Sequence, residues 1–237
     1  MACAFIGTSG WSYKGWRQRW LSYCAERFTG IEVNGTFYRL QSKDTFRKWR
    51  EETPDTFRFA IKGHRYATHS KKLNDVAEPV RLMKERAEPM GEKLAVVVWQ
   101  LPASLQKSSE KLAKFLDDLG TWPEVRHALE LRHRSWFDDE TAALLEEHDV
   151  AVCQSDAPDF PLWERVTTDL VYVRLHGHTR KYASRYSSRL LRGWSHKVCN
   201  WLDEGRDVHV YFDNDAEGHA PYDALRLLEM VRGGSAG

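Results

Sequence analysis

Residues 171–177 place a cation and an imidazole on one face of a predicted strand. They read Val-Tyr-Val-Arg-Leu-His-Gly, and side chains alternate between the two faces of a strand. Tyr172, Arg174 and His176 therefore share one face, and the aliphatic residues share the other. A guanidinium can hold a carboxylate or phosphate through two N–H groups, and an imidazole can transfer a proton near neutral pH. This strand predicts a binding or catalytic space beside its ionisable face.

Similar side chains follow the other predicted strands. In a closed barrel of alternating strands and helices, the carboxyl ends of all strands meet at one face, where active sites lie. Charges that converge there must be paired or must bind something, because an unpaired buried charge is costly. The residues of this set are Glu32, Asn34, Lys62, His64, Gln100, Glu130, Arg132, Asp156, Arg174, His176, Asp213 and Asn214.

The favoured chemistry is acid–base catalysis on an anionic substrate, such as a phosphorylated one. Lysine, arginine and histidine donors would hold the anion, and a carboxylate would act as general base or acid. The same charges could instead form a structural ion-pair network. The predicted catalytic residues are Glu32, Glu130, Asp156 and His176, and the predicted substrate-binding residues are Trp11, Asn34, Lys62, His64, Gln100, Arg132, Trp136, Arg174 and Asn214.

Two other kinds of site remain open. Carboxylates and an imidazole from four strand ends are suitable ligands for a catalytic divalent metal, but the nearby arginines disfavour a cation, so neither a metal ligand nor a cofactor is assigned. A basic stretch interleaved with aromatic residues is typical of a nucleic-acid cleft. The metal candidates are Glu130, Asp156, His176 and Asp213, and the basic aromatic stretch comprises Arg180, Lys181, Tyr182, Arg185, Tyr186, Arg189, Arg192 and Trp194.

The elements that must position these residues alternate between strand and helix. Eight predicted strands, nearly all followed by a helix, indicate an α/β protein that folds as a single TIM-like (β/α)8 barrel. No linker divides the chain, so we expect one domain over residues 1–232 and a flexible tail at 233–237. The predicted strands cover residues 2–6, 28–33, 57–61, 93–99, 125–131, 150–154, 170–175 and 208–212, and the predicted helices cover residues 16–26, 44–52, 75–88, 109–119, 138–148, 187–204 and 222–231.

The composition narrows the class of protein. The chain has 35 basic and 34 acidic residues, a net charge of +1, so no global basic field indicates nucleic acid. Its four cysteines form no Cys-x-x-Cys pair, which favours free thiols. Neither a signal-peptide pattern nor an apolar run of the roughly 20 residues of a membrane span is visible. We therefore expect a cytoplasmic protein with a small anionic partner.

Seven short motifs resemble, in order, those of the YecE-like family, domain of unknown function 72. The resemblance covers residues 5 to 230 and implies a TIM-barrel-like fold, but it does not supply a reaction. Where the family usually has Phe-Asn-Asn-Asp, this chain has Phe212-Asp213-Asn214-Asp215, which adds a carboxylate to that strand end. The motifs are Gly7-Thr8-Ser9-Gly10-Trp11, Glu32-Val33-Asn34 with Thr36-Phe37-Tyr38, Phe59-Ala60-Ile61-Lys62, Gln100-Leu101-Pro102, Glu130-Leu131-Arg132-His133 with Ser135-Trp136, Tyr172-Val173-Arg174-Leu175-His176-Gly177, and Tyr211-Phe212-Asp213-Asn214-Asp215.

Overall fold

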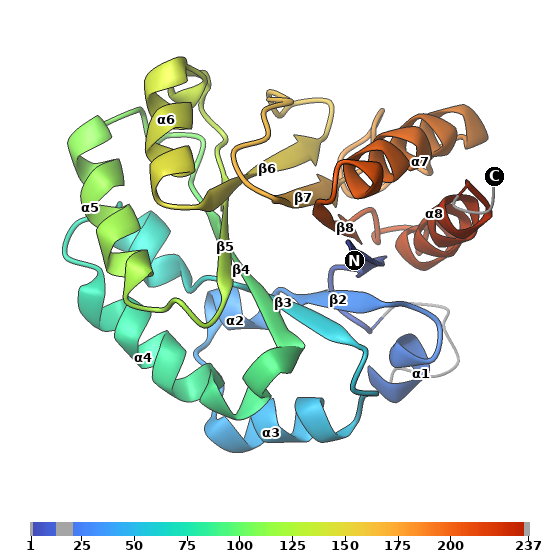
Figure 1. Cartoon of the computed structure of the whole chain (residues 1–237), viewed down its shortest axis with the longest axis horizontal. Helices are drawn as coiled ribbons and strands as arrows, with labels where there is room; N and C mark the ends of the chain where they lie inside the picture. Colours follow the sequence, from blue (N-terminus) through green and yellow to red (C-terminus); the bar gives the residue numbers. More distant parts are fainter. Residues whose placement is uncertain (1, 13–20, 235–237) are drawn as a thin grey trace.

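Eight parallel strands form a nearly closed barrel with helices on its outside (Figure 1). The structure is a computed structural model that describes residues 2–12 and 21–234. Each strand pairs with its neighbours in the chain, β1 pairs with β8, and a bridge between Ser9 and Glu32 joins β1 to β2. The predicted TIM-like (β/α)8 fold is confirmed. The strands are β1 (Ala4–Thr8), β2 (Gly30–Val33), β3 (Arg58–Lys62), β4 (Leu94–Gln100), β5 (Arg126–Glu130), β6 (Val150–Asp156), β7 (Leu170–Leu175) and β8 (Asp207–Phe212).

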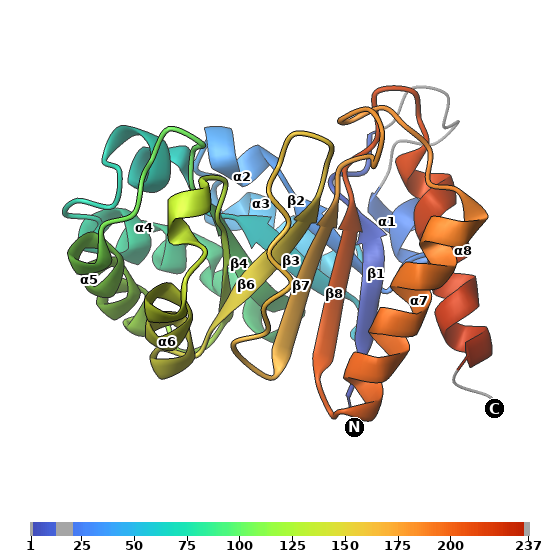
Figure 2. The ribbon, with the colours of Figure 1, turned by 90° about the horizontal axis from the view of Figure 1, so that it is seen from above.

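The helices cover the outer side of the sheet, and Figure 2 shows the strand arrowheads pointing toward the same end of the barrel. That end, where the strands finish, is called the barrel mouth below. The helical segments are α1 (Leu21–Ala25), α2 (Gly35–Tyr38), α3 (Lys43–Glu51), η1 (Tyr66–Ser70), α4 (Ala77–Ala87), η2 (Glu88–Lys93), α5 (Ser109–Gly120), η3 (Arg134–Trp136), α6 (Asp139–Glu147), α7 (Ser188–Asp203) and α8 (Ala220–Gly234).

Short polar side chains begin several of these helices. Ser42, Ser108, Asp138 and Ser187 precede α3, α5, α6 and α7, and each side chain accepts the backbone N–H of the residue three positions later. Such caps satisfy amide groups that the first helical turn leaves without a partner. The local sequence therefore fixes where these four helices begin.

Most differences from the predicted elements are short. The segments α2, η1, η2 and η3 were not predicted, because so few residues cannot show a helical period. The predicted helix over residues 16–26 is described only from Leu21 to Ala25, and its first part lies outside the described residues. Helix α8 ends at Gly234, two residues into the segment that was expected to form a flexible tail, and residues 235–237 lie outside the described part.

The two faces of the strands build two separate cores. Val171, Val173 and Leu175 face outward and pack in the main core with the helices. Tyr172 and Tyr211 face inward, in a smaller cluster with alanine residues from three other strands. This confirms the predicted split of β7. Because alanine side chains leave space inside the barrel, the two phenol rings fit beneath the mouth.

Barrel closure depends on a close approach between β1 and β2. A Cβ atom at Gly7 would lie 1.9 Å from the carbonyl oxygen of Gly30. A Cβ atom at Gly30 would in turn lie 3.2 Å from the Cβ of Phe5 in β1 and 2.9 Å from the carbonyl oxygen of Arg58 in β3. Glycine at both positions lets the first two strands come together, which brings Glu32 beside the last strands of the barrel.

Candidate active site at the barrel mouth

Arg174, near the end of β7, lies at the centre of a buried ion cluster. Its Nη2 is 2.7 Å from Glu32 Oε1, and its Nη1 is 2.7 Å from Glu130 Oε2. Nη2 also lies 3.1 Å from Asp213 Oδ2. The side chains of Arg174, Glu32 and Glu130 are fully buried, so these charge-assisted bonds are shielded from water. The guanidinium therefore contacts carboxylates of the chain itself.

Both oxygens of the Glu32 carboxylate accept hydrogen bonds. Ser9 Oγ donates to Oε1 and the Tyr172 hydroxyl donates to Oε2, each at 2.7 Å. Arg174 Nε donates to Oε2 at 2.9 Å. Burial raises the pKa of Tyr172 well above its usual value, and the charge of Glu32 raises it further, so the phenol stays protonated and remains a donor. With its lone pairs occupied in this way, Glu32 is a poor candidate for taking a proton from a substrate.

His176 lies between two carboxylates of the cluster. Its Nδ1 is 3.0 Å from Asp213 Oδ2, and its Nε2 lies 3.4 Å from Arg174 Nη1 and 3.6 Å from Glu130 Oε1. Nε2 thus faces both a guanidinium, which can only donate, and a carboxylate, which accepts. Phe160 and Tyr182 cover the imidazole edge-on, with ring centroids 5.3 and 5.5 Å away.

Two carboxylates of the cluster, Glu130 and Asp213, are held in the charged form. Burial opposes ionisation of Glu130, but the charges of Arg132 and Arg174 outweigh it, so the pKa of Glu130 lies well below its usual range. Burial likewise opposes ionisation of Asp213, but the hydrogen bond from His176 and the charge of Arg174 lower the pKa of Asp213. Glu130 is therefore unsuited to be a proton donor near neutral pH.

Arg132 lies closer to solvent than Arg174. Its Nε is 2.8 Å and its Nη2 2.7 Å from Glu130 Oε1. Its side chain is 13% exposed, and Nη1 has no hydrogen-bond partner within residues 2–12 and 21–234. The guanidinium carbon lies 4.1 Å from the centre of the Phe160 ring, and Lys181 Nζ lies 4.7 Å from the same centre. Two cations thus meet on one aromatic ring at the rim of the mouth.

Lys62, at the end of β3, is a second open cation of the mouth. Its side chain points into the barrel and its ammonium group lies 4.3 Å from the centre of the Phe37 ring. The residue is only 8% exposed. Burial, followed by the charge of Arg174, lowers the pKa of Lys62 to about 8, although Glu130 and Glu32 partly oppose the shift.

His69 is a residue of the mouth that the sequence analysis missed. It lies in η1, a π-helical turn, and its ring packs edge-on against Phe37 with centroids 5.0 Å apart. Its Nε2 lies 3.5 Å from Gln100 Nε2. Burial and then the charge of Lys62 lower the pKa of His69 to about 4, so the imidazole is neutral at pH 7. Irregular turns of this kind are frequent at functional sites, but they leave no periodic signal in a sequence.

Asp215 was also not predicted as a site residue. Burial, and then the neighbouring charge of Asp213, raises the pKa of Asp215. The group lies beyond the end of β8, within the motif whose first carboxylate distinguishes this chain from the usual pattern. Its only sequence signal was therefore its place in that motif.

The structure brings eight of the predicted site residues together. They line the mouth or lie just beneath it, because each belongs to the inward face of its strand or follows that face beyond the strand end. Asn34 joins this group through a long contact, 3.5 Å from its Oδ1 to Arg174 Nη2. The eight residues are Glu32, Asn34, Lys62, Gln100, Glu130, Arg132, Arg174 and His176.

Asp156 and Asn214 lie outside this group. The Asp156 carboxylate accepts the Tyr186 hydroxyl at 2.8 Å and contacts His178 Nδ1 at 3.1 Å. Asn214 Nδ2 donates to Asp223 Oδ2 at 3.0 Å. Asp156 pairs in register with Leu175 on the outward face of β7, so strand alternation directs it toward the helices rather than the mouth.

Three further predicted binding residues lie apart from the cluster. Trp136 is buried in η3, and its indole N–H donates to the Leu105 carbonyl at 2.8 Å. Trp11 packs edge-on against Trp49 of α3. His64 Nδ1 accepts the backbone N–H of Tyr66 at 3.3 Å.

The predicted basic aromatic stretch does not form one continuous surface. Tyr186 and Trp194 are buried in the main core, where they are not available to stack on bases. Arg180 pairs with Glu217, and Lys181 pairs with Asp159.

Within the two described segments, no group of three or more histidine, cysteine, aspartate or glutamate side chains is arranged to hold a metal ion. Of the four predicted metal candidates, Glu130, His176 and Asp213 surround the Arg174 guanidinium. Asp156 lies in the separate contact described above.

Among the helices described here, none is long and apolar enough to cross a membrane.

The fold and the mouth define a class of protein: a parallel β/α barrel whose strand ends hold a buried Arg174–Glu32–Glu130 cluster beneath two partly open cations. The chain belongs to the family described as "Protein of unknown function DUF72", which matches residues 5–236. The resemblance expected from its motifs is thereby confirmed.

Relatives and solved structures agree with this assignment. The UPF0759 protein YunF of Bacillus subtilis (strain 168) is 24% identical over 265 residues, which cover 96% of this chain and 94% of that protein. The UPF0759 protein YecE of Escherichia coli (strain K12) is 29% identical over 137 residues, 56% of this chain and 50% of that protein. A DUF72 family crystal structure from Thermotoga maritima MSB8 superposes with a TM-score of 0.85 at 27% identity, covering 97% of this chain and 99% of that one. One from Enterococcus faecalis V583 has a TM-score of 0.85 at 20% identity, covering 97% and 95%.

Proposed function

We propose that the barrel mouth is an enzyme active site that binds a small anionic substrate and acts on it by acid–base chemistry. The proposal rests on a difference in hydrogen bonding between the carboxylates and the cations of the mouth. Both oxygens of Glu32 and Glu130 accept hydrogen bonds, whereas Lys62 Nζ and Arg132 Nη1 have no acceptor among the described residues. Unused N–H donors beside satisfied carboxylates favour a ligand that brings oxygen acceptors of its own.

The two arginines take different parts in this proposal. Arg132, which keeps an unpaired nitrogen near solvent, contacts the anion. Arg174 is a positioning residue, because its nitrogens contact Glu32, Glu130 and Asp213. Either a carboxylate or a phosphate fits this role, and no particular anionic group or size is assigned to the substrate.

The test measures binding of inorganic phosphate and of citrate to the purified protein by isothermal titration calorimetry at low salt. The variant Arg132→Met should weaken binding by about tenfold or more, since a charge-assisted pair contributes roughly 1.5–3 kcal/mol. Arg134→Met is the matched control, because Arg134 is exposed and lies only two residues further along the chain. Equal affinities for wild type and Arg132→Met, or no binding of either anion, would contradict the proposal.

A further inference from the structure

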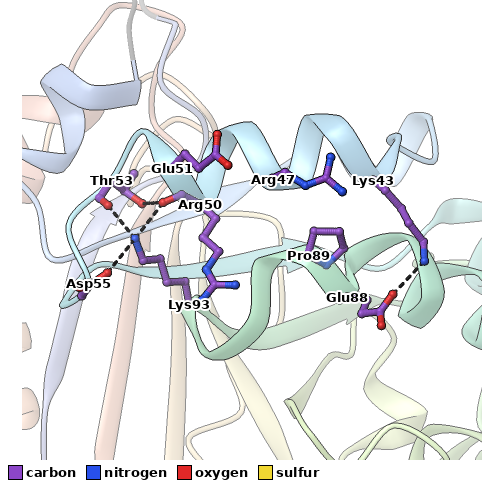
Figure 3. Close-up of a pocket in the computed structure, with 9 residues that line it drawn as sticks. All are labelled: Lys43, Arg47, Arg50, Glu51, Thr53, Asp55, Glu88, Pro89 and Lys93. Carbon is purple, nitrogen blue, oxygen red and sulfur yellow. Dashed lines mark hydrogen bonds and ion pairs between the residues drawn. The ribbon is translucent and has the colours of Figure 1, made fainter.

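Lys62 and Lys93 are both buried lysines, but their ammonium groups have opposite surroundings. Lys93 is 4% exposed, and its Nζ donates to the carbonyl oxygens of Arg50 at 2.8 Å and Thr53 at 2.6 Å. It also lies 3.4 Å from Asp55 Oδ1. Figure 3 shows these contacts at one end of a groove of about 750 Å³ between α3 and η2. The Lys93 ammonium group therefore has its acceptors within the chain, and its contacts connect the end of α3 to the start of β4.

Lys62 has no comparable set of acceptors. Within residues 2–12 and 21–234, no hydrogen bond and no ion pair within 4.0 Å reaches its Nζ, and the nearest specific contact is the face of the Phe37 ring. Glu32 and Glu130 act on it only at longer range, and the guanidinium groups of Arg174 and Arg132 oppose its charge. A buried ammonium group without acceptors is expensive, and proteins retain such groups mainly where they function.

These surroundings favour the neutral amine. At a pKa of about 8, roughly a fifth of the Lys62 side chains would be uncharged near pH 7.4. A neutral amine in a desolvated position beside other cations is a nucleophile toward carbonyl carbon. Arg132 lies at the same mouth, and its charge acts on the Lys62 ammonium group, so we take the carbon next to an anion held by Arg132 as the one that meets this amine.

We propose that Lys62 is the nucleophile of this site and forms an imine with the carbonyl carbon of an anionic aldehyde or keto acid held by Arg132. The step is balanced without any oxidant or reductant. The nitrogen lone pair adds to the carbonyl carbon, the carbonyl oxygen takes up protons as the nitrogen loses them, and one water molecule leaves as the C=N bond forms. His69, neutral at pH 7 and packed on the same Phe37 ring, is the neighbouring group able to accept and return a proton.

This assignment rests on the proposed function for the anion, and one experiment separates the two. Wild-type protein is incubated with sodium glyoxylate, or with acetaldehyde as its uncharged counterpart, and the imines are reduced with sodium cyanoborohydride. Peptide mass spectrometry then locates the adducts. We expect Lys62 to be modified about tenfold faster than Lys93 or the exposed Lys72, with half-maximal rate near pH 8. Glyoxylate should react at lower concentration than acetaldehyde, and inorganic phosphate should compete.

The outcomes separate the nucleophile assignment from the proposed anion site. Labelling of Lys62 no faster than that of Lys93 overturns the nucleophile assignment, and if phosphate still binds, the proposed anion site stands. Fast labelling of Lys62 by both aldehydes, without competition by phosphate, supports the amine and contradicts the anion site. In Lys62→Arg the fast adduct should vanish while the slow labelling of Lys93 and Lys72 and the far-UV circular dichroism spectrum match those of wild type, which shows that loss of labelling does not reflect an unfolded protein.

Discussion

Arg174 Nη1 lies 2.7 Å from Glu130 Oε2, and neither side chain has exposed surface. The same guanidinium contacts Glu32 and Asp213, so three carboxylates at the ends of separate strands share one cation. Removal of one partner from such a buried set leaves uncompensated charge in the interior. Arg174 therefore links the chemistry of the mouth to the stability of the barrel.

Replacement of this cation is expected to be costly. Arg174→Met should lower the free energy of unfolding by about 3–5 kcal/mol, measured by urea denaturation, because the buried carboxylates lose their partner. The control is Arg81→Met, since Arg81 pairs with Glu78 and Glu85 on the exposed surface of α4 and its loss should cost less than about 1 kcal/mol. Equal losses in the two variants would show that the buried cluster contributes no more than a surface pair.

Replacement of Lys62 should have a pH-dependent effect of the opposite sign. The pKa of Lys62 is about 8 in the folded chain against an ordinary 10.5, so between these values the unfolded chain binds a proton that the folded chain does not. Wild-type stability therefore rises as pH increases through this window, by an amount on the order of 3 kcal/mol. Lys62→Met should remove that rise and be relatively most stabilising at pH 7. Unfolding free energies of both proteins at pH 7 and 10.5 test this, and a constant difference between them would refute it.

Two buried histidines should make the fold sensitive to mild acid. Burial lowers the pKa of His127 to about 4 and that of His209 to about 3. His127 Nδ1 accepts the Trp99 indole N–H at 3.2 Å, and His209 Nδ1 contacts the Tyr211 hydroxyl at 2.8 Å. As pH falls from 6.5 toward 4, the unfolded chain gains protons that the folded chain excludes, so stability decreases.

The variant His209→Gln checks this acid sensitivity, because it keeps a polar group without an imidazole. Its unfolding free energy should change less than that of wild type between pH 7 and pH 4. If the unfolding free energy of the variant depended on pH as that of wild type does, His209 would not contribute to the loss of stability in acid.

Closure of the barrel gives a prediction that concerns packing alone. Gly7→Ala places a Cβ atom 1.9 Å from the Gly30 carbonyl oxygen, so β1 or β2 must shift, at a cost of about 3 kcal/mol. Gly193→Ala, in the middle of α7, meets no atom within 4 Å and should instead raise stability by about 0.5–1 kcal/mol through better helix propensity. Thermal melting of the two variants distinguishes them, and a stable Gly7→Ala protein would show that the strands tolerate a wider gap.

The sequence was sufficient for the barrel and for most inward positions. Local position in the sequence placed Arg174 on the ionisable face of its strand, because side chains alternate with period 2, and placed Glu32 and Glu130 at strand ends before any tertiary contact was known. It failed at Asp156 because the strand continues to that residue, and a displacement of one position turns a side chain to the other face. The seven motifs indicated the family in the same way, because each is a short stretch of neighbouring residues.

Only the tertiary structure decided which charges are paired. Sequence spacing cannot show that Arg174 contacts Glu32, 142 residues away, because that distance depends on barrel register and on the close approach at Gly7. It also cannot show that Lys93 has two carbonyl acceptors whereas Lys62 has none among the described residues. Residue type and strand position placed Lys62 at the mouth, but its lowered pKa follows from burial and from neighbouring charges that only folding brings together.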